Sequence, residues 1–451
     1  MRLCERQRRR LKLRIVEGFQ PAKSLLSRQI PAGAYPVSEK IKQGLKNMFA
    51  TDDPEQAVRQ IIDEVRERGD AALFDLTMKI DGIRLTSLKE SKKQVADAYK
   101  EVDEELVSAL KLAAERINYF HGAQKDKIWH EVDESGLRQL IRPLRRVGIY
   151  VPGGTAHYPS TVLMTAIPAK VASVDEVILV TPPRADGSVS PSVLVAADIA
   201  RVDRIFSIGG AQAIAALAYG TESIPCVDKI CGPGNIFVML AKKTVFGTVA
   251  IDGLQGPSEV LIIADETASA EYCAADLLAQ AEHDPLASAI LVTTSRQLAD
   301  DVQQEIAQQM EGLSRQDIAK ESLERGIIAV VASTDEAIEL ANLYAPEHLC
   351  LMMDEADSYI AEIRNAGCIV IGREATIVLS DYVEGPSHAL PTGGTARFSS
   401  PLNVSDFLKY INVISVDDDS LKRLGPAAAV IARAEGFNAH AQAMEKRLIK
   451  G

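Results

Sequence analysis

The sequence predicts an α/β protein built from two parallel-sheet units. From Arg146 onward, short β-rich runs alternate with alanine-rich helical stretches, as is typical of a parallel sheet covered by helices on both faces. A second series of the same kind begins at Glu259. Clusters of glycine and proline at Val151–Gly154 and Gly256–Pro257 separate the segments, so we expect the middle unit to be inserted into the other.

The first regular element expected is a helix that follows Asp53. Asp53 can cap this helix, Pro54 suits its first turn, and Gly69 ends it. Its apolar stripe recurs at helical spacing and consists of Val58, Ile61, Ile62 and Val65. We interpret this helix as a packing element and not as part of a site.

The strands follow in two series. Those of the first series are RVGIYV from Arg146, EVILVT from Glu176 and RIFSIGG from Arg204, each followed by a plausible helix. Those of the second series are EVLIIA from Glu259, AILVT from Ala289, IIAVV from Ile327 and CIVI from Cys368. The stretch from about Asn403 is too short for a core of its own, so we expect it to pack on another domain or on a second subunit.

Composition and charge exclude several classes of protein. The 451 residues carry a net charge of −12, which disfavours nucleic acid and anionic membranes as partners. The basic run Met1–Arg14 lacks the apolar core of a secretory signal and reads as an exposed extension, and no apolar run approaches the roughly 20 residues that cross a bilayer. The six cysteines form no CxxC pair, which fits a reducing cytoplasm.

Four polar residues in the second half of the chain are candidate metal ligands. Gln280 and His283 are three residues apart at the end of a helical stretch, so one metal could bind both. Asp381 offers a carboxylate and His440 another imidazole, and such N and O donors suit zinc or a related divalent ion. By residue type alone, the alternative is that these side chains are hydrogen-bonding residues at helix ends and turns.

A carboxylate and an imidazole are adjacent at Glu347 and His348, in the segment YAPEHL. A loop or helix start after Pro346 could present both to a cavity, where an adjacent acid and base can transfer protons. The alternative is a helix-capping glutamate beside a partly exposed histidine.

Three glycine-rich segments could approach a dinucleotide. They are VPGG from Val151, GGAQ from Gly209 and GPGN from Gly232. None has the GxGxxG pattern, and each alone is more often a tight turn, but three such turns after strands fit ligand binding at the carboxyl edge of a sheet. Tyr150 could stack on such a ligand or could simply belong to the core.

Taken together, these segments closely resemble the histidinol dehydrogenase family over nearly the whole chain after Arg14. The resemblance rests on GIYVPGGTAHYPSTVLM, GGAQAIAALAYGTESIPCVDKICGPGN, GPSEVLIIAD, DLLAQAEHDP, APEHL, DYVEGPSHALPTGGTARFSSPL and AEGFNAH, which occur in family order. It implies two Rossmann-like domains, one inserted in the other, with short helical terminal segments that intertwine in a homodimer.

The resemblance also implies roles for individual residues. The implied zinc ligands are Gln280, His283, Asp381 and His440, and the implied catalytic pair is Glu347 and His348. The implied substrate contacts are these zinc ligands and His348 together with Ser258, Tyr382, His388 and Glu435, and the implied NAD contacts are Tyr150, Gln212 and Asn235. His440 and Glu435 would reach the site from the partner subunit, so the active sites of the homodimer would be shared.

The implied reaction oxidises L-histidinol to L-histidinal and then to L-histidine, the last step of histidine biosynthesis, with one NAD used in each oxidation. His348 would take the hydroxyl proton, Glu347 would activate water, and one zinc ion per subunit would position the substrate.

With the dimer included, four segments are expected. They are an N-terminal extension and dimer-associated segment at residues 1–44, a larger α/β domain at 45–148 with 258–402, an inserted Rossmann-like domain at 149–257, and a C-terminal dimerisation segment at 403–451.

Three short segments differ in sequence from the commonest family pattern, namely AEHDP, PSH and IDGLQGPSE. They leave room for a paralogue that oxidises another zinc-chelated alcohol, although Glu435, Tyr382 and His388 together favour histidinol. The alternative from another class is a non-catalytic dinucleotide-binding or zinc-binding protein, which would not need Glu347 beside His348.

Overall fold

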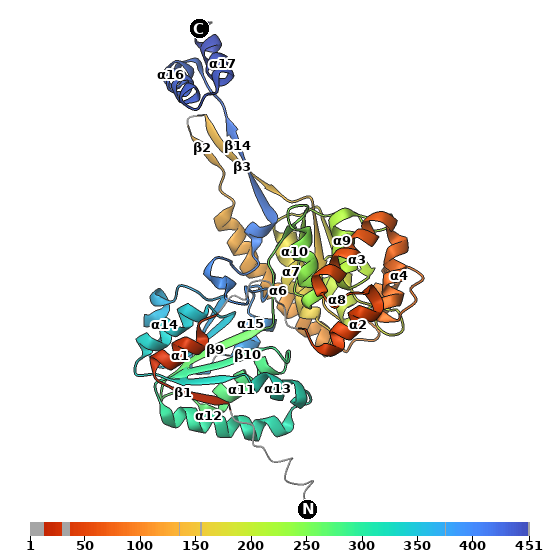
Figure 1. Cartoon of the computed structure of the whole chain (residues 1–451), viewed down its shortest axis with the longest axis vertical. Coiled ribbons are helices and arrows are strands. Elements are labelled where there is room, and N and C mark those ends of the chain that lie inside the picture. Colours follow the sequence, from red (N-terminus) through yellow and green to blue (C-terminus); the bar gives the residue numbers. More distant parts are fainter. Residues whose placement is uncertain (1–12, 29–36, 135, 154–155, 375, 450–451) are drawn as a thin grey trace, which may run out of the picture.

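The computed structural model describes residues 13–28, 37–134, 136–153, 156–374 and 376–449, which form two α/β domains and a projecting arm (Figure 1). Residues 1–12 of the expected basic extension and Gly154 of the VPGG segment lie outside the described residues.

One domain is built on a six-stranded sheet in which all neighbouring strands are parallel. In spatial order its strands are β1 (Arg14–Glu17), β11 (Ile327–Val330), β10 (Ser288–Thr293), β9 (Glu259–Ala264), β12 (His348–Met352) and β13 (Cys368–Ile371). One face packs on α11 (Ala270–Ala281), α12 (Arg296–Gln309) and α13 (Gln316–Leu323). The other face packs on α1 (Phe19–Leu26) and α14 (Thr334–Tyr344). The expected cover on both faces is confirmed.

The other domain is built on a five-stranded parallel sheet. Its strands are, in spatial order, β6 (Arg204–Ser207), β5 (Glu176–Thr181), β4 (Arg146–Tyr150), β7 (Lys229–Cys231) and β8 (Ala250–Ile251). One face packs on α5 (Lys92–Ala98), α6 (Glu104–Ile128), α7 (Pro159–Val171) and α8 (Pro191–Ile199). The opposite face packs on α2 (Glu39–Phe49), α3 (Pro54–Arg68), α4 (Asp70–Asp81), α9 (Gly210–Tyr219) and α10 (Ile236–Val245). The strand order reverses between β4 and β7, where ligands commonly bind in α/β folds.

The hydrophobic cores assign the N-terminal elements to the two sheets. Helices α2 to α6 pack on the five-stranded sheet, whose core also takes in Ala389 and Leu402, while β1 and α1 belong to the six-stranded sheet. Residues 39–251 therefore lie in the chain between two parts of the six-stranded domain, and the expected bounds of 45–148 with 258–402 and of 149–257 stay a prediction. The apolar stripe of a helix shows that it is buried but not on which sheet.

Individual elements follow the sequence closely. Asp53 accepts a hydrogen bond from Glu55 N at 3.0 Å, and Gly69 ends α3 with φ of 57°. The predicted stripe of α3 is buried throughout: Val58, Ile61, Ile62 and Val65 are at most 3% exposed. β5 and β9 have the predicted bounds, whereas β1, β7 and β12 are strands that we did not predict.

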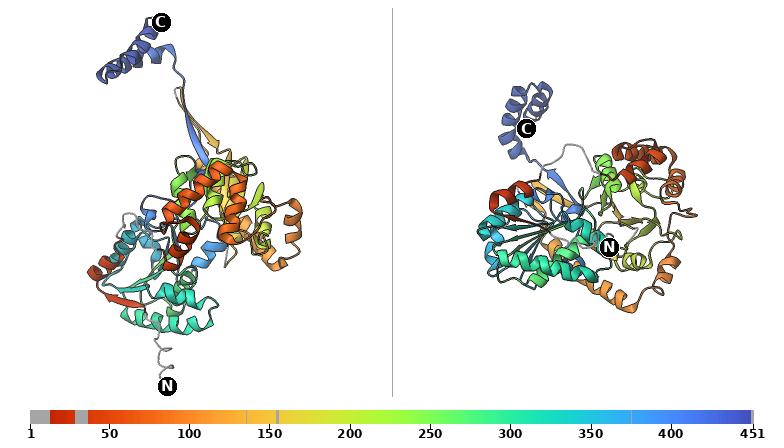
Figure 2. Two further views of the ribbon diagram at one scale, coloured as in Figure 1. Left: turned by 45° about the vertical axis from the view of Figure 1, so that its right-hand side comes forward. Right: turned by 60° about the horizontal axis from the view of Figure 1, so that its bottom comes forward.

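A projecting arm completes the chain (Figure 1). It consists of the antiparallel strands β2 (Val132–Glu134), β3 (Leu137–Pro143) and β14 (Leu408–Ile414), followed by α16 (Asp418–Ala434) and α17 (Asn438–Leu448). Both views of Figure 2 place these two helices, drawn in dark blue, away from the sheets. Short elements between the last sheet strands and the arm are η2 (Ala356–Glu362), α15 (Ile377–Tyr382), η3 (Thr395–Arg397) and η4 (Val404–Phe407), and η1 (Met310–Gly312) follows α12.

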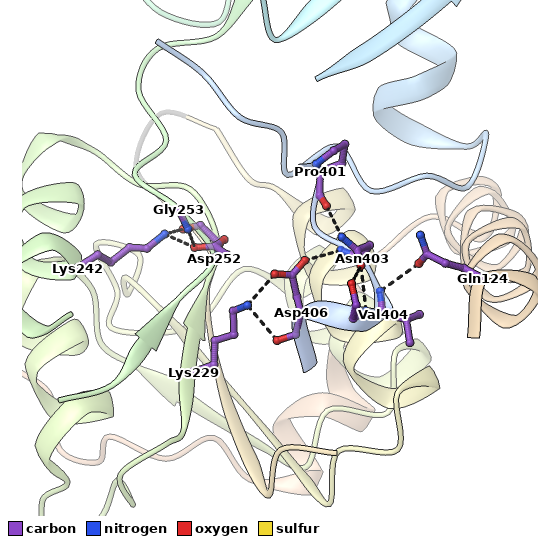
Figure 3. Close-up of polar contacts among 11 residues, drawn as sticks. Gln124, Lys229, Lys242, Asp252, Gly253, Pro401, Asn403, Val404 and Asp406 are labelled. Atoms are coloured by element: carbon purple, nitrogen blue, oxygen red, sulfur yellow. Dashed lines mark hydrogen bonds and ion pairs between the residues drawn. The ribbon is translucent and has the colours of Figure 1, made fainter. Parts of the chain in front are cut away.

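The base of the arm is fixed to the five-stranded sheet. Lys229 Nζ, at the start of β7, donates to Asp406 Oδ1 at 2.7 Å and to the Asp406 carbonyl at 2.9 Å (Figure 3). Gln124 of α6 accepts a hydrogen bond from Val404 N at 3.0 Å. These contacts hold the strand that leads to α16 and α17. Among the described helices, none combines the length and the apolar character that crossing a bilayer requires.

Candidate active site

The catalytic pair expected from the sequence lies where the two domains meet. His348 is the first residue of β12 and Ser258 immediately precedes β9, so both lie at the amino edge of the six-stranded sheet. The start of α7, which follows the carboxyl end of β4, reaches the same region, because Thr161 Oγ1 lies 3.3 Å from His388 Nε2. The site therefore lies between the amino edge of one sheet and the carboxyl edge of the other.

Glu347 is buried beside the strands. Glu347 is 6% exposed, and its Oε2 accepts a hydrogen bond from the backbone N of Glu259 at 2.7 Å. Burial raises the pKa of Glu347 to about 8. A carboxyl group with a pKa near neutrality can both take up and release a proton, so Glu347 is suited to proton transfer.

His348 is equally buried and is paired with an aspartate. Its Nε2 donates to Asp381 Oδ1 at 3.1 Å, and its Nδ1, which is 3.9 Å from Glu347 Oε2, has no hydrogen-bond partner. Burial lowers the pKa of His348, but the hydrogen bond to Asp381 and the charges of Glu347 and Asp381 outweigh it and raise the pKa to about 9. Without a competing cation at Asp381, this imidazole keeps its proton at neutral pH.

Asp381, which lies in α15, is hydrogen-bonded to two histidines. Its backbone carbonyl accepts a hydrogen bond from His388 Nδ1 at 2.7 Å, which leaves His388 Nε2 to accept from the Thr161 hydroxyl. Burial acts to raise the pKa of Asp381, but the hydrogen bond and charge of His348 lower it overall, so Asp381 is a carboxylate. Burial lowers the pKa of His388 and favours its neutral form.

Two other expected metal ligands, Gln280 and His283, come from the end of the helix that packs against α15. Gln280 lies in the last turn of α11, and its Oε1 is buried without a hydrogen-bond partner. His283 follows α11 and retains exposure to solvent, although desolvation by the surrounding protein lowers its pKa; the charge of Asp381 acts on it in the opposite sense. An unpaired amide oxygen, a neutral imidazole and a carboxylate are donors that fit zinc. Within the described residues, no cluster of three histidine, cysteine or acidic side chains has the geometry of a metal site.

The structure does not bring His440 and Glu435 to this site within one chain. His440 lies on α17 and Glu435 ends α16, both are exposed, and Figure 1 shows these helices at the far end of the arm. The remaining expected substrate residues do lie at the site: Ser258 is half-buried beside β9, and Tyr382, 49% exposed, follows Asp381 in α15.

The residues expected to contact NAD line the carboxyl edge of the five-stranded sheet. Tyr150 ends β4, Gln212 lies in the first turn of α9 after β6, and Asn235 caps α10 after β7 by accepting hydrogen bonds from Phe237 N and Val238 N. Gln212 is 1% exposed, and both polar atoms of its amide lack a partner. Tyr150 accepts a hydrogen bond from Gly210 N at 3.2 Å, and burial raises its pKa to about 12.

The glycine-rich turns pack too closely to admit side chains. A Cβ on Gly232, whose φ is 112°, would lie 2.1 Å from the Tyr150 carbonyl oxygen. Beside these turns, a cavity of about 140 Å³ opens between the segments after β4 and β5, where Gly153, Thr181 and Arg184 are among its lining residues. All three turns follow strands of one sheet, as expected.

Sequence reasoning missed several residues at the site. Thr161, which contacts His388, lies in an ordinary helix start and carries no local signal. Glu259 does carry a signal in the sequence, because it is the acidic first residue of the otherwise apolar strand EVLIIA; in the structure it is only 6% exposed. Lys242 also carries such a signal, because it is a lysine within an apolar helix. It is 1% exposed and donates to Asp252 and to the Gly232 carbonyl.

Comparisons with known proteins show the family of the chain. The family model described as histidinol dehydrogenase matches residues 46–448. A histidinol dehydrogenase of Dehalococcoides mccartyi strain 195 is 55% identical over 437 residues, which cover 97% of this chain and 100% of the relative. One of Clostridium acetobutylicum is 49% identical, covering 91% of this chain and 96% of the relative.

A solved structure supports the same assignment at the level of the fold. The crystal structure of histidinol dehydrogenase from Elizabethkingia anophelis superposes with a TM-score of 0.88 at 34% identity, and the match covers 97% of this chain and 98% of that chain. On sequence and fold together, the chain belongs to the histidinol dehydrogenase family.

Proposed function

We propose that the protein oxidises L-histidinol through L-histidinal to L-histidine at one zinc-dependent site, with two NAD used in sequence, as the last step of histidine biosynthesis. The observation that carries the proposal is the buried pair Glu347 and His348, with His348 hydrogen-bonded to Asp381 at 3.1 Å. A binding protein has no need for a buried acid and base at the meeting edge of two sheets. The names of the relatives agree with this substrate.

The residues present fit a zinc ion. Gln280, His283 and Asp381 would hold it together with His440 of a partner subunit, and the buried Oε1 of Gln280, which has no hydrogen-bond partner, supports this set most directly. A bound zinc ion would supply a Lewis acid that orients the substrate nitrogens and competes with His348 for the Asp381 carboxylate. With Asp381 engaged in this way, His348 would no longer have the acceptor that holds its proton.

The acid and base residues divide the chemistry between them. His348, once neutral, takes the hydroxyl proton of histidinol as a hydride leaves the carbinol carbon for NAD. Glu347 takes one proton from the water that attacks the aldehyde carbon. The hydrated aldehyde then gives its hydride to the second NAD and its remaining acidic proton to His348, and becomes the carboxylate. Both steps take place at one site, which retains the reactive aldehyde between them.

The remaining site residues recognise substrate and cofactor. Ser258, Tyr382 and His388 surround the catalytic pair, and Glu435 of the partner would bind the imidazole or amine of the substrate. Tyr150, Gln212 and Asn235 would contact NAD, and the buried Gln212 amide without partners is the strongest support for a ligand there.

We further propose a homodimer in which the arm of each chain completes the site of the other. The arm carries His440 and Glu435 far from its own domains (Figure 1). Its helices expose large apolar side chains that include Val430 at 67%, Ile431 at 59% and Phe437 at 54%. Exposed apolar surface of this kind marks a protein interface. The cysteines among the described residues are free thiols, which supports a place in the cytoplasm.

NADH formation from a limiting amount of L-histidinol tests the proposal. We expect two NADH per histidinol from zinc-loaded enzyme, and L-histidine as the product. A single NADH per substrate would contradict the double oxidation. No turnover of histidinol by a folded, zinc-bound dimer, with turnover of another chelating amino alcohol, would instead indicate a paralogue of different specificity.

A further inference from the structure

A single arginine near the N-terminus holds two elements that flank the catalytic pair. The Arg28 guanidinium donates from Nη1 and Nη2 to the two carboxylate oxygens of Glu259, at 2.7 and 2.6 Å. Its Nε donates to the Tyr344 carbonyl at 2.8 Å, and its plane lies 3.9 Å from the centre of the Tyr344 ring. One planar fork therefore binds the start of β9 and the end of α14 at the same time.

Both partners of Arg28 lie directly beside Glu347. Tyr344 is the last residue of α14, and only the residues 345–347 connect it to His348. Glu259 is the neighbour of Glu347 across the sheet, because His348 pairs with Val260 in register, and the Glu259 backbone N donates to Glu347 Oε2 at 2.7 Å. Arg28 thus fixes the connection that carries Glu347 and also the strand that holds its carboxylate.

This network is less exposed than an ordinary surface pair. The side chains of Arg28 and Glu259 are 23% and 8% exposed, whereas the ion pair of Lys23 with Glu339, which joins α1 to α14, has side chains that are 39% and 57% exposed. Two acidic side chains, Glu259 and Glu347, lie close together in this buried region, and Arg28 supplies the positive charge that pairs with one of them.

We propose that Arg28 is a positioning residue for Glu347, which fixes the direction from which Glu347 approaches the water that attacks the aldehyde. This inference rests on the proposed function, since it assigns Arg28 to the second of the two oxidations. This role does not require Arg28 to contact the substrate. Arg28 precedes both of its partners by more than 200 residues in the sequence. The N-terminal segment therefore contributes to the geometry of the site.

The test is the replacement of Arg28 by lysine and by glutamine. Lysine keeps the positive charge but cannot donate to Tyr344 and to both oxygens of Glu259 in the geometry of the fork. We expect kcat for L-histidinal oxidation to fall about tenfold in Arg28→Lys and further in Arg28→Gln, because a small misplacement of a reacting group has large effects on rate. KM for histidinal, zinc content and the rate of the first oxidation should stay within about twofold of wild type.

Two reference variants calibrate the result. Glu347→Gln should show the same selective loss of the second oxidation in a stronger form. Lys23→Gln removes an exposed ion pair that also ends on α14, so its rates for both oxidations should equal those of wild type.

A wild-type kcat for histidinal in Arg28→Lys would overturn the proposal. So would equal losses in both oxidations together with loss of zinc, since these indicate a general structural role. A crystal structure of Arg28→Lys gives a readout that does not depend on activity: Glu347 should leave the Glu259 backbone N, and an unchanged contact would also overturn the proposal. If wild type itself fails to oxidise histidinol and histidinal, the proposed function fails, while the crystal structure still decides the role of Arg28.

Discussion

His348 donates a hydrogen bond to Asp381 over 3.1 Å, and the two residues come from different elements, β12 and α15. The pair joins the proposed general base to a proposed zinc ligand. Removing one member should therefore have different effects from removing the other.

His348→Ala should lower kcat for both oxidations by about 10² to 10⁴, the usual range for loss of a general base, while the zinc content stays that of wild type. Asp381→Ala should lose zinc as well as activity. NADH formation and metal analysis of the purified variants measure both effects. A His348→Ala enzyme that loses its zinc would assign His348 to the metal and not to proton transfer.

Sharing of the active sites can be tested by mixing two inactive variants. His348→Ala and His440→Ala should each be inactive alone. After exchange of subunits at equal amounts, half of the dimers are mixed and each mixed dimer holds one intact site, so about a quarter of wild-type activity should return. Size-exclusion chromatography confirms that dimers have formed. No recovery in an exchanged dimer would show that His440 serves its own chain.

Lys242 should contribute strongly to stability. Lys242 and Asp252 form an ion pair (Figure 3), and their side chains are each 2% exposed. Lys242 also donates to Gln255 Oε1 at 2.8 Å. Lys242→Met leaves the buried Asp252 without its counter-ion and should lower the free energy of unfolding by about 3–5 kcal/mol, measured by urea denaturation. The neighbouring Lys243, which pairs with Glu55 and is 45% exposed, is the control: Lys243→Met should cost less than about 1 kcal/mol. Equal losses in the two variants would contradict a special role for the buried pair.

His121 should make the folded state sensitive to acid. It is 0% exposed, its Nδ1 donates to Gln124 Oε1 at 3.0 Å, and burial lowers its pKa. Because the unfolded chain then binds a proton more readily than the folded chain, stability falls as the pH drops through the unfolded-state pKa of about 6.5, by up to about 1.4 kcal/mol for each unit by which the pKa is lowered. His121→Gln should reduce this loss between pH 7.5 and 5.5 in urea titrations. Parallel pH profiles for the two proteins would rule out this role.

The strands that could be predicted are those that are buried on both faces. EVILVT and EVLIIA became β5 and β9 with the expected bounds, since a continuous apolar run has few other uses. β12 was missed because HLCLM begins with a histidine and contains cysteine and methionine, which carry little strand preference. The three strands of the arm were also missed, as their alternation is weak.

The residues of the candidate site were named one by one only through family resemblance, and their roles stay a prediction. Gln280 and His283 are close in sequence, but Asp381 reaches them through the packing of α15 on α11, which no local pattern encodes. The sheet on which the helices of residues 45–148 pack could not be read locally for the same reason, because the choice between two sheets depends on tertiary contacts. Arg28 gave no signal at all, since a lone arginine after a short helix is ordinary in sequence.

The edge strand of the six-stranded sheet has a consequence for biosynthesis of the chain. β1 pairs with β11, which leaves the ribosome about 310 residues later, so at about 5 to 20 residues per second β1 waits roughly 15 to 60 s for its neighbour. Most of the core of the five-stranded domain is encoded between them and can form during that interval, although Val404 and Phe407 of the same core follow later. During translation the nascent chain therefore carries an unpaired N-terminal strand, a form in which it is open to chaperones and to aggregation.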